Sequence, residues 1–151
     1  MEIETNRLTL KAVTPEIVDI FSGNYELGDH ISFYLSQLQN DPSMLGWGVW
    51  FVVDKESNTV IGDIGFKGKP NDHHTVDIGY GVHPTYQGKG IATEAVRGLI
   101  DWAFQQNVEI VTADCLQDNI PSIKVLEKIG MTKTKTHDDM FYWEIKKIPT
   151  T

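Results

Sequence analysis

The stretch that most constrains this chain is a strand, a glycine loop and a helix, in that order, between residues 75 and 107. The apolar run Val76–Val82 predicts a short strand, and a periodic helix is predicted from about Gly88 to Gln106. Gly88 and Gly90 allow the backbone to approach a bulky anion closely. The first N–H groups of the helix lack intrahelical partners, and the helix dipole favours negative charge at that end. The pattern therefore predicts a phosphate-binding site, although a plain tight turn would use the same glycines.

Two familiar phosphate loops are excluded by single positions. A Walker loop would need glycine at His83 and serine or threonine at Gly90. A dinucleotide-binding fingerprint that starts at Gly88 would need glycine at Thr93. An enzyme of nucleotide phosphates is therefore disfavoured, because the sequence shows neither its loop signature nor its magnesium ligands.

Composition is that of an ordinary globular protein. The 151 residues, 40% of them hydrophobic and 23% charged, predict a single domain spanning residues 1–151. No apolar run approaches the roughly 20 residues of a membrane span, and the amino end shows no targeting pattern. The single cysteine, Cys115, excludes an internal disulfide and is interpreted as a core residue rather than a nucleophile. We therefore expect a cytoplasmic protein with no membrane partner.

The formal net charge of −8 argues against a nucleic-acid partner, because nucleic-acid-binding domains carry basic patches. An acidic surface would mildly attract cationic substrates such as amines. Many acidic proteins carry such charge for solubility alone, so both interpretations stay open.

Hydrophobic periodicity and turn residues divide the chain into elements in the order β-αα-βββ-α-β-α-ββ. The unit between residues 76 and 115 is predicted to be a right-handed parallel crossover. The fold class is α+β, with a mixed sheet and some α/β character. Strands are predicted at Ile3–Lys11 (an edge strand), Trp47–Val53, Thr59–Phe66, Val76–Val82, Glu109–Cys115, Met131–Thr136 and Met140–Lys146. Helices are predicted from Pro15 to a stop at Gly23, at Asp29–Leu38, at Gly88–Gln106 and at Pro121–Ile129.

The loop carries the pattern Gln-x-x-Gly-x-Ala at Gln87, Gly90 and Ala92, after a strand that ends in Val-His-Pro. This resembles the acyl-CoA pyrophosphate loop of the GNAT superfamily of N-acetyltransferases. Further segments are similar to the branch that contains the ribosomal-protein N-terminal acetyltransferases. They are Glu4–Leu10 (ETNRLTL), Ile61–Gly62, Asp77–Tyr80 (DIGY, with aspartate for the branch's glutamate) and Asn119–Met131 (NIPSIKVLEKIGM).

The resemblance covers nearly the whole chain and implies the GNAT acyl-CoA N-acyltransferase fold. That fold has a central, mostly antiparallel mixed sheet of about seven strands flanked by about four helices. Its strands at 76–82 and 109–115 diverge at one end, and the pantetheine arm lies in the gap. The implied activity is transfer of acetyl from acetyl-CoA, as co-substrate and without a metal, to a primary amine by direct attack in a ternary complex.

The same resemblance implies the cofactor contacts. Backbone groups near Val82 would pair with the pantetheine amides, and loop amides would hold the pyrophosphate. The side chain of Lys89 could contact a phosphate or lie in solvent. The implied cofactor-binding residues are Val82, Gln87, Gly88, Lys89, Gly90, Ile91, Ala92, Asn119 and Ser122.

Asn119 and Ser122 open the helix that follows the second crossover strand. Asn119 is expected to cap this helix, and the resemblance adds a contact with the CoA arm. Ser122 could protonate or hydrogen-bond the departing thiolate, or simply bond to its own backbone. Many relatives have a tyrosine acid where this chain has Leu126, so the usual proton donor is missing.

The chemistry needs a group that accepts a proton from the amine and an N–H that stabilises the oxyanion. Asp77 and Asp114 lie on the two strands that flank the expected gap, and both are candidate bases. Each could equally be a solvated or ion-paired residue. His83 is a third candidate, and proximity of donor and amine could supply much of the rate without a strong base.

The acceptor is left open between a protein N-terminus and a small amine. Aromatic residues could line its pocket, although aromatics in such elements more often belong to the core. The alternative function is a non-catalytic domain that binds or senses acyl-CoA, and the protein is expected to be a monomer or a homodimer. The aromatic candidates are Phe33, Tyr34, Trp47, Trp50 and Tyr80.

Overall fold

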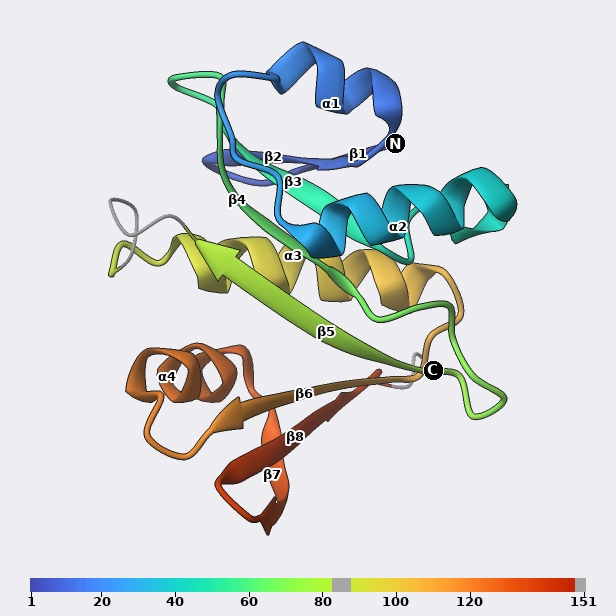
Figure 1. Cartoon of the computed structure of the whole chain (residues 1–151). Coiled ribbons are helices and arrows are strands. Elements are labelled where there is room, and N and C mark those ends of the chain that lie inside the picture. Colours follow the sequence, from blue (N-terminus) through green and yellow to red (C-terminus); the bar gives the residue numbers. More distant parts are fainter. Residues whose placement is uncertain (83–87, 149–151) are drawn as a thin grey trace.

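The computed structural model describes residues 1–82 and 88–148, with the backbone alone at Val82. All its strands belong to one sheet, in the order β1-β2-β3-β4-β5-β6-β8-β7 (Figure 1). The strands are β1 (Glu2–Glu4), β2 (Leu8–Ala12), β3 (Val49–Asp54), β4 (Thr59–Phe66), β5 (Thr75–Val82), β6 (Ile110–Leu116), β7 (Thr132–His137) and β8 (Met140–Lys146). The helices are α1 (Pro15–Phe21), α2 (Asp29–Asn40), α3 (Ile91–Gln105) and α4 (Ile120–Ile129), with a short 3-10 turn at Pro42–Met44.

The predicted order of elements is confirmed, with one correction at the amino end. The expected edge strand Ile3–Lys11 is a hairpin of two strands, so the sheet has eight strands and β2 lies inside it. The turn between them is held by hydrogen bonds from the Thr5 amide to the Leu8 carbonyl and from the Leu8 amide to Thr5 Oγ1, at 2.9 and 3.1 Å. A side chain that satisfies the backbone thus replaces the glycine or proline that would have revealed the turn.

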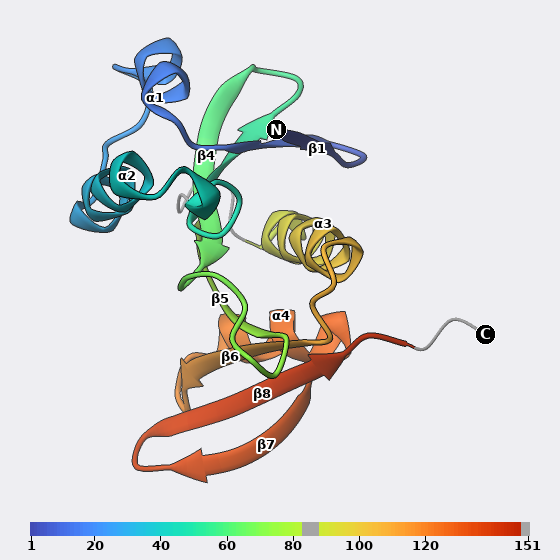
Figure 2. The same cartoon turned by 90° about the vertical axis from the view of Figure 1, so that its right-hand side faces the viewer.

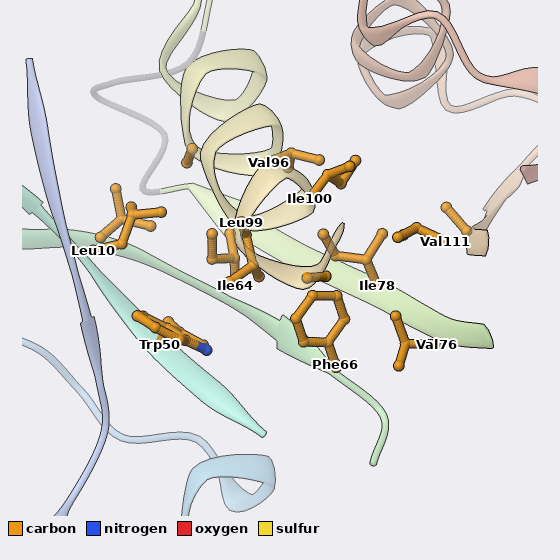
Figure 3. Close-up of a cluster of buried hydrophobic side chains, with 14 of the residues drawn as sticks. Leu10, Trp50, Ile64, Phe66, Val76, Ile78, Val96, Leu99, Ile100 and Val111 are labelled. Carbon is orange, nitrogen blue, oxygen red and sulfur yellow. The ribbon is translucent and has the colours of Figure 1, made fainter. Parts of the chain in front are cut away.

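Helices cover both faces of the sheet. In Figure 2, α1 and α2 lie on one side of β4 and α3 lies on the other. Strand β3 is buried on both faces, because Trp50 and Val52 pack in the cluster under α3 while Phe51 and Val53 pack in the cluster under α1 and α2. Figure 3 shows the larger cluster, where Leu99 of α3 meets side chains from four strands.

The sheet is interrupted between its two central strands. Parallel strands β5 and β6 pair only from Thr75–Asp77 to Ile110–Thr112. Beyond that point β5 continues along β4, and β6 continues along β8. Figure 1 shows the two strands together at their amino ends and apart at their carboxyl ends. The divergence implied by the resemblance is confirmed.

Among the described residues, none of the helices has the length and apolarity needed to cross a bilayer.

Candidate functional site

The glycine loop and the start of α3 form the first part of the site. Gly88 and Gly90 have φ angles of 78° and 77°, in the left-handed region that side chains disfavour. Gly90 is the N-cap, so α3 begins at Ile91 rather than at Gly88 as predicted. A Cβ at Gly88 would meet no atom within 4 Å, which leaves open space beside the loop.

The start of α3 lacks the side-chain cap that two other helices have. Thr14 caps α1 and Asn119 caps α4 by accepting a backbone N–H, whereas no side chain of the described residues does so for α3. The first amides of α3 therefore remain available to an external acceptor. These residues fit the diphosphate of an acyl-CoA in conformation, space and polarity.

The gap between β5 and β6 forms the second part. Tyr80 of β5 reaches across to α4, where its hydroxyl donates to the Ser122 carbonyl at 3.5 Å. Burial raises the pKa of Tyr80, which outweighs the opposing effect of the Ser122 bond, so the hydroxyl stays protonated at neutral pH. Asn119 Oδ1 accepts the Ser122 amide at 3.3 Å, which confirms the predicted cap.

The two predicted carboxylate bases meet at one lysine. Lys67 Nζ lies 2.9 Å from Asp77 Oδ2 and 3.7 Å from Asp114 Oδ2. The other oxygen of Asp77 accepts the Thr112 hydroxyl at 2.8 Å. Its bond to Asp77 raises the pKa of Lys67 against the effect of burial, so the lysine remains a cation. Both carboxylates thus face a fixed positive charge.

A cleft of about 610 Å³ lies on the same face of the sheet, beside α2. Its floor includes Gly79 and Gly81, where an added Cβ would meet nothing within 4 Å. Of the aromatic candidates, Phe33, Tyr34 and Tyr80 border this cleft. Trp47 and Trp50 instead pack against Trp102 of α3, at ring-centroid distances of 4.9 and 5.1 Å, and belong to the core.

A cluster that the sequence analysis missed lies at the rim of the cleft. Asp63 of β4 accepts the Tyr25 hydroxyl at 2.5 Å through Oδ2, and its Oδ1 lies 2.9 Å from His30 Nε2. Burial and the neighbouring Asp63 carboxylate raise the pKa of Tyr25, so the phenol stays neutral and donates. Asp63 pairs with Gly81 in the sheet, so its side chain stands beside the open floor of the cleft. The available signal was a lone carboxylate in an apolar strand.

Three predicted positions are described only in part or not at all. Gln87 and His83 lie outside the described residues. The backbone of Val82 pairs with Gly62 in the ladder between β4 and β5. Lys89 is placed, and its carbonyl accepts Arg7 Nη1 at 2.8 Å.

Comparison with known proteins gives a consistent result. Residues 5–132 match the family model of the acetyltransferase (GNAT) domain. The chain is 27% identical to the uncharacterized N-acetyltransferase YjdG of Bacillus subtilis over 160 residues, which cover 93% of this chain and 95% of the relative.

Two solved structures share the fold. The ribosomal-protein-S5-alanine acetyltransferase of Vibrio fischeri superposes with a TM-score of 0.79 at 22% identity, covering 97% of this chain and 96% of that one. The spermidine N-acetyltransferase of Vibrio cholerae, in complex with CoA and spermine, superposes with a TM-score of 0.73 at 17% identity, covering 94% and 96%.

Proposed function

The chain belongs to the GNAT acetyltransferase family, and from this premise we propose that it transfers acetyl from acetyl-CoA to a primary amine held in the cleft beside α2. One observation carries the proposal: the ladder between β5 and β6 stops after Asp77 and Thr112. The gap that follows has the glycine loop at the carboxyl end of β5 and the cleft along its α2 face. A thioester in this gap would present its acetyl group to an amine in the cleft, for direct attack in a ternary complex.

The proposed cofactor contacts follow the loop and the gap. Amides of residues 88–92 bind the diphosphate, and the backbone at Val82 pairs with the pantetheine amides beside Asn119. A helix terminus contributes up to about 2 kcal/mol toward a charge, whereas a micromolar ligand needs about 8 kcal/mol. Contacts along the pantetheine must therefore supply much of the affinity.

Proton transfer is assigned from the hydrogen-bond pattern. Asp77 and Asp114 stay predictions as bases, but Lys67 stabilises their charged forms and so weakens them as proton acceptors. His30 lines the cleft and is oriented by Asp63, the arrangement of a histidine base with its carboxylate. We assign proton removal from the amine to His30. Ser122 remains the proposed partner of the thiolate, with the Tyr80 hydroxyl next to its carbonyl as a second donor.

Calorimetry with CoA and a thiol-release assay test the proposal. We expect saturable CoA binding and thiol release with at least one amine from a panel of peptides with free N-termini and of polyamines. A peptide preference or a polyamine preference would define the acceptor class. CoA binding without turnover on any amine would instead support a sensing domain, and absence of CoA binding would refute the site.

A pair of variants locates the binding. Gly90→Glu should abolish CoA binding, because it places bulk and negative charge in the diphosphate site. Gly23→Glu is the matched control, since Gly23 also has a positive φ (87°), faces open space and lies at the end of α1. A folded Gly90→Glu protein that binds CoA as the wild type does would contradict the assignment.

A further inference from the structure

The amino-terminal motif around Thr5 and Arg7 has no role in the proposal so far, yet it contacts the cofactor loop. Arg7 Nη1 donates to the Lys89 carbonyl at 2.8 Å, and Arg7 Nε donates to Glu94 Oε1 at 2.8 Å. The Arg7 amide and the Thr5 hydroxyl both donate to Glu94 Oε2, at 2.8 and 2.5 Å. The turn between β1 and β2 is therefore bonded to both the loop and the first turns of α3.

We propose that Arg7, supported by Thr5 and Glu94, is a positioning residue that fixes the glycine loop in the conformation that binds the diphosphate of acetyl-CoA. The inference rests on the proposed function, because it assigns this work to the same loop. Arg7 acts on the cofactor through the loop backbone.

The first step of the argument is the planarity of the peptide bond. The Lys89 carbonyl and the Gly90 N–H belong to one peptide unit, and in a trans peptide they point in opposite directions. No cis peptide occurs in the described chain. When Arg7 holds this carbonyl on the hairpin side, the Gly90 N–H must point away from the hairpin. The bond thus selects one of the orientations that two flanking glycines would otherwise allow.

The second step is the rigidity of the hairpin that carries Arg7. Leu8 and Leu10 of β2 are fully buried. Lys55 bonds to the turn twice, from its ammonium to the Thr5 carbonyl at 2.6 Å and from its amide to the Arg7 carbonyl at 3.0 Å. Helix α3 lies so close that a Cβ at Gly98 would stand 3.0 Å from the Thr5 methyl group. Arg7 therefore extends from a fixed platform.

The third step concerns charge. Glu94 lies in the first turn of α3, where a carboxylate interacts well with the helix dipole but would repel a bound diphosphate. Burial acts to raise the pKa of Glu94, and the bonds from Thr5 and Arg7 outweigh it, so the pKa is lowered and the group stays ionised. The Arg7 guanidinium offsets this charge beside the anion site.

The test compares two acetyl donors, acetyl-CoA and the acetyl thioester of N-acetylcysteamine, which has no phosphate. Arg7→Ala should weaken CoA binding about tenfold or more, the effect expected for loss of charged hydrogen bonds. It should leave the rate with the phosphate-free donor unchanged, because that donor does not use the loop. Arg7→Lys keeps the charge but loses the two-pronged contact, so it should weaken CoA binding in the same direction.

Lys11→Ala is the matched control, because it breaks the Lys11–Glu2 pair (2.7 Å) in the same hairpin without touching the loop. It should change neither donor's kinetics. If Arg7→Ala does not fold, Arg7→Lys gives the same comparison. Equal loss on both donors, or CoA affinity equal to that of the wild type, overturns the inference. Failure of the wild type itself to bind CoA would instead overturn the proposed function.

Discussion

Asp63 and Asp77 are carboxylates on the same face of the sheet, and their partners give them different chemistry. Asp77 is bonded to a lysine, which holds it as an anion. Asp63 is bonded to a histidine and a tyrosine, of which the histidine can take up a proton. The difference makes Asp77 a structural charge and His30 a proton acceptor.

His30→Ala should lower kcat about 100-fold, the contribution of one general base, while CoA affinity stays unchanged. Added imidazole should restore part of the rate, which a purely structural role of the side chain would not allow. His137→Ala removes the other histidine that is paired with an aspartate, an exposed pair at 3.4 Å in the β7–β8 turn, and should have no effect. Steady-state kinetics with and without imidazole check this. A full rate in His30→Ala would return the role to Asp77, which Asp77→Asn would then test.

At this scale the sequence predicted what is local. Thr14 and Asn119 cap their helices as expected, because a cap depends on residues three positions apart. The contact of Lys67 with both predicted bases was not predictable. It depends on the register that sets Asp77 opposite Thr112, which the sequence does not specify.

Among the elements, β3 and β4 approach each other most closely at a glycine. A Cβ at Gly65 would stand 2.0 Å from the Gly48 carbonyl oxygen, which is backbone and cannot rotate away. Gly65→Ala should therefore lower the free energy of unfolding by about 2–3 kcal/mol, the cost of overpacking. Urea unfolding measures it.

Gly79→Ala is the control for this prediction, because it lies opposite Gly65 in the next strand and faces open space. Its free energy of unfolding should change by less than about 0.5 kcal/mol. Its added methyl group would enter the cleft, so the variant should lose acceptor affinity while it keeps its stability. Equal destabilisation of the two variants would contradict the packing described.

The helices and strands were predictable where periodicity was strong, as in α3 and β4. The hairpin at the amino end was not, since its turn contains no glycine or proline and the residue alternation runs through it. The start of α3 was placed too early for a similar reason. The left-handed Gly90 ends the loop, and periodicity does not report backbone handedness.

For the whole molecule, ligand binding should be visible as stability. CoA at 100 times its dissociation constant should add about 2.7 kcal/mol, which for a chain of this size raises the unfolding temperature by about 5–10 °C. Pantetheine lacks the diphosphate and should give a smaller shift at the same concentration. Differential scanning fluorimetry measures both, and equal shifts would argue against a diphosphate site at the loop.

The topology of the whole sheet was predictable, because a strand–helix–strand unit closes in one hand and sets its strands in parallel. The acceptor cleft was not, since it is built from α2, β4 and β5 through contacts between distant residues. Its polar cluster joins residues 25, 30 and 63, which no local pattern connects.

The short pairing of β5 with β6 also limits how this protein can evolve. Substitutions that zipped these neighbours together to their tips would add ladder bonds and raise thermal tolerance. They would also fill the slot into which we place the thioester, and turnover would cease. Selection for robustness must therefore act on other regions of the molecule, and this seam is expected to remain the weakest part of an otherwise continuous sheet.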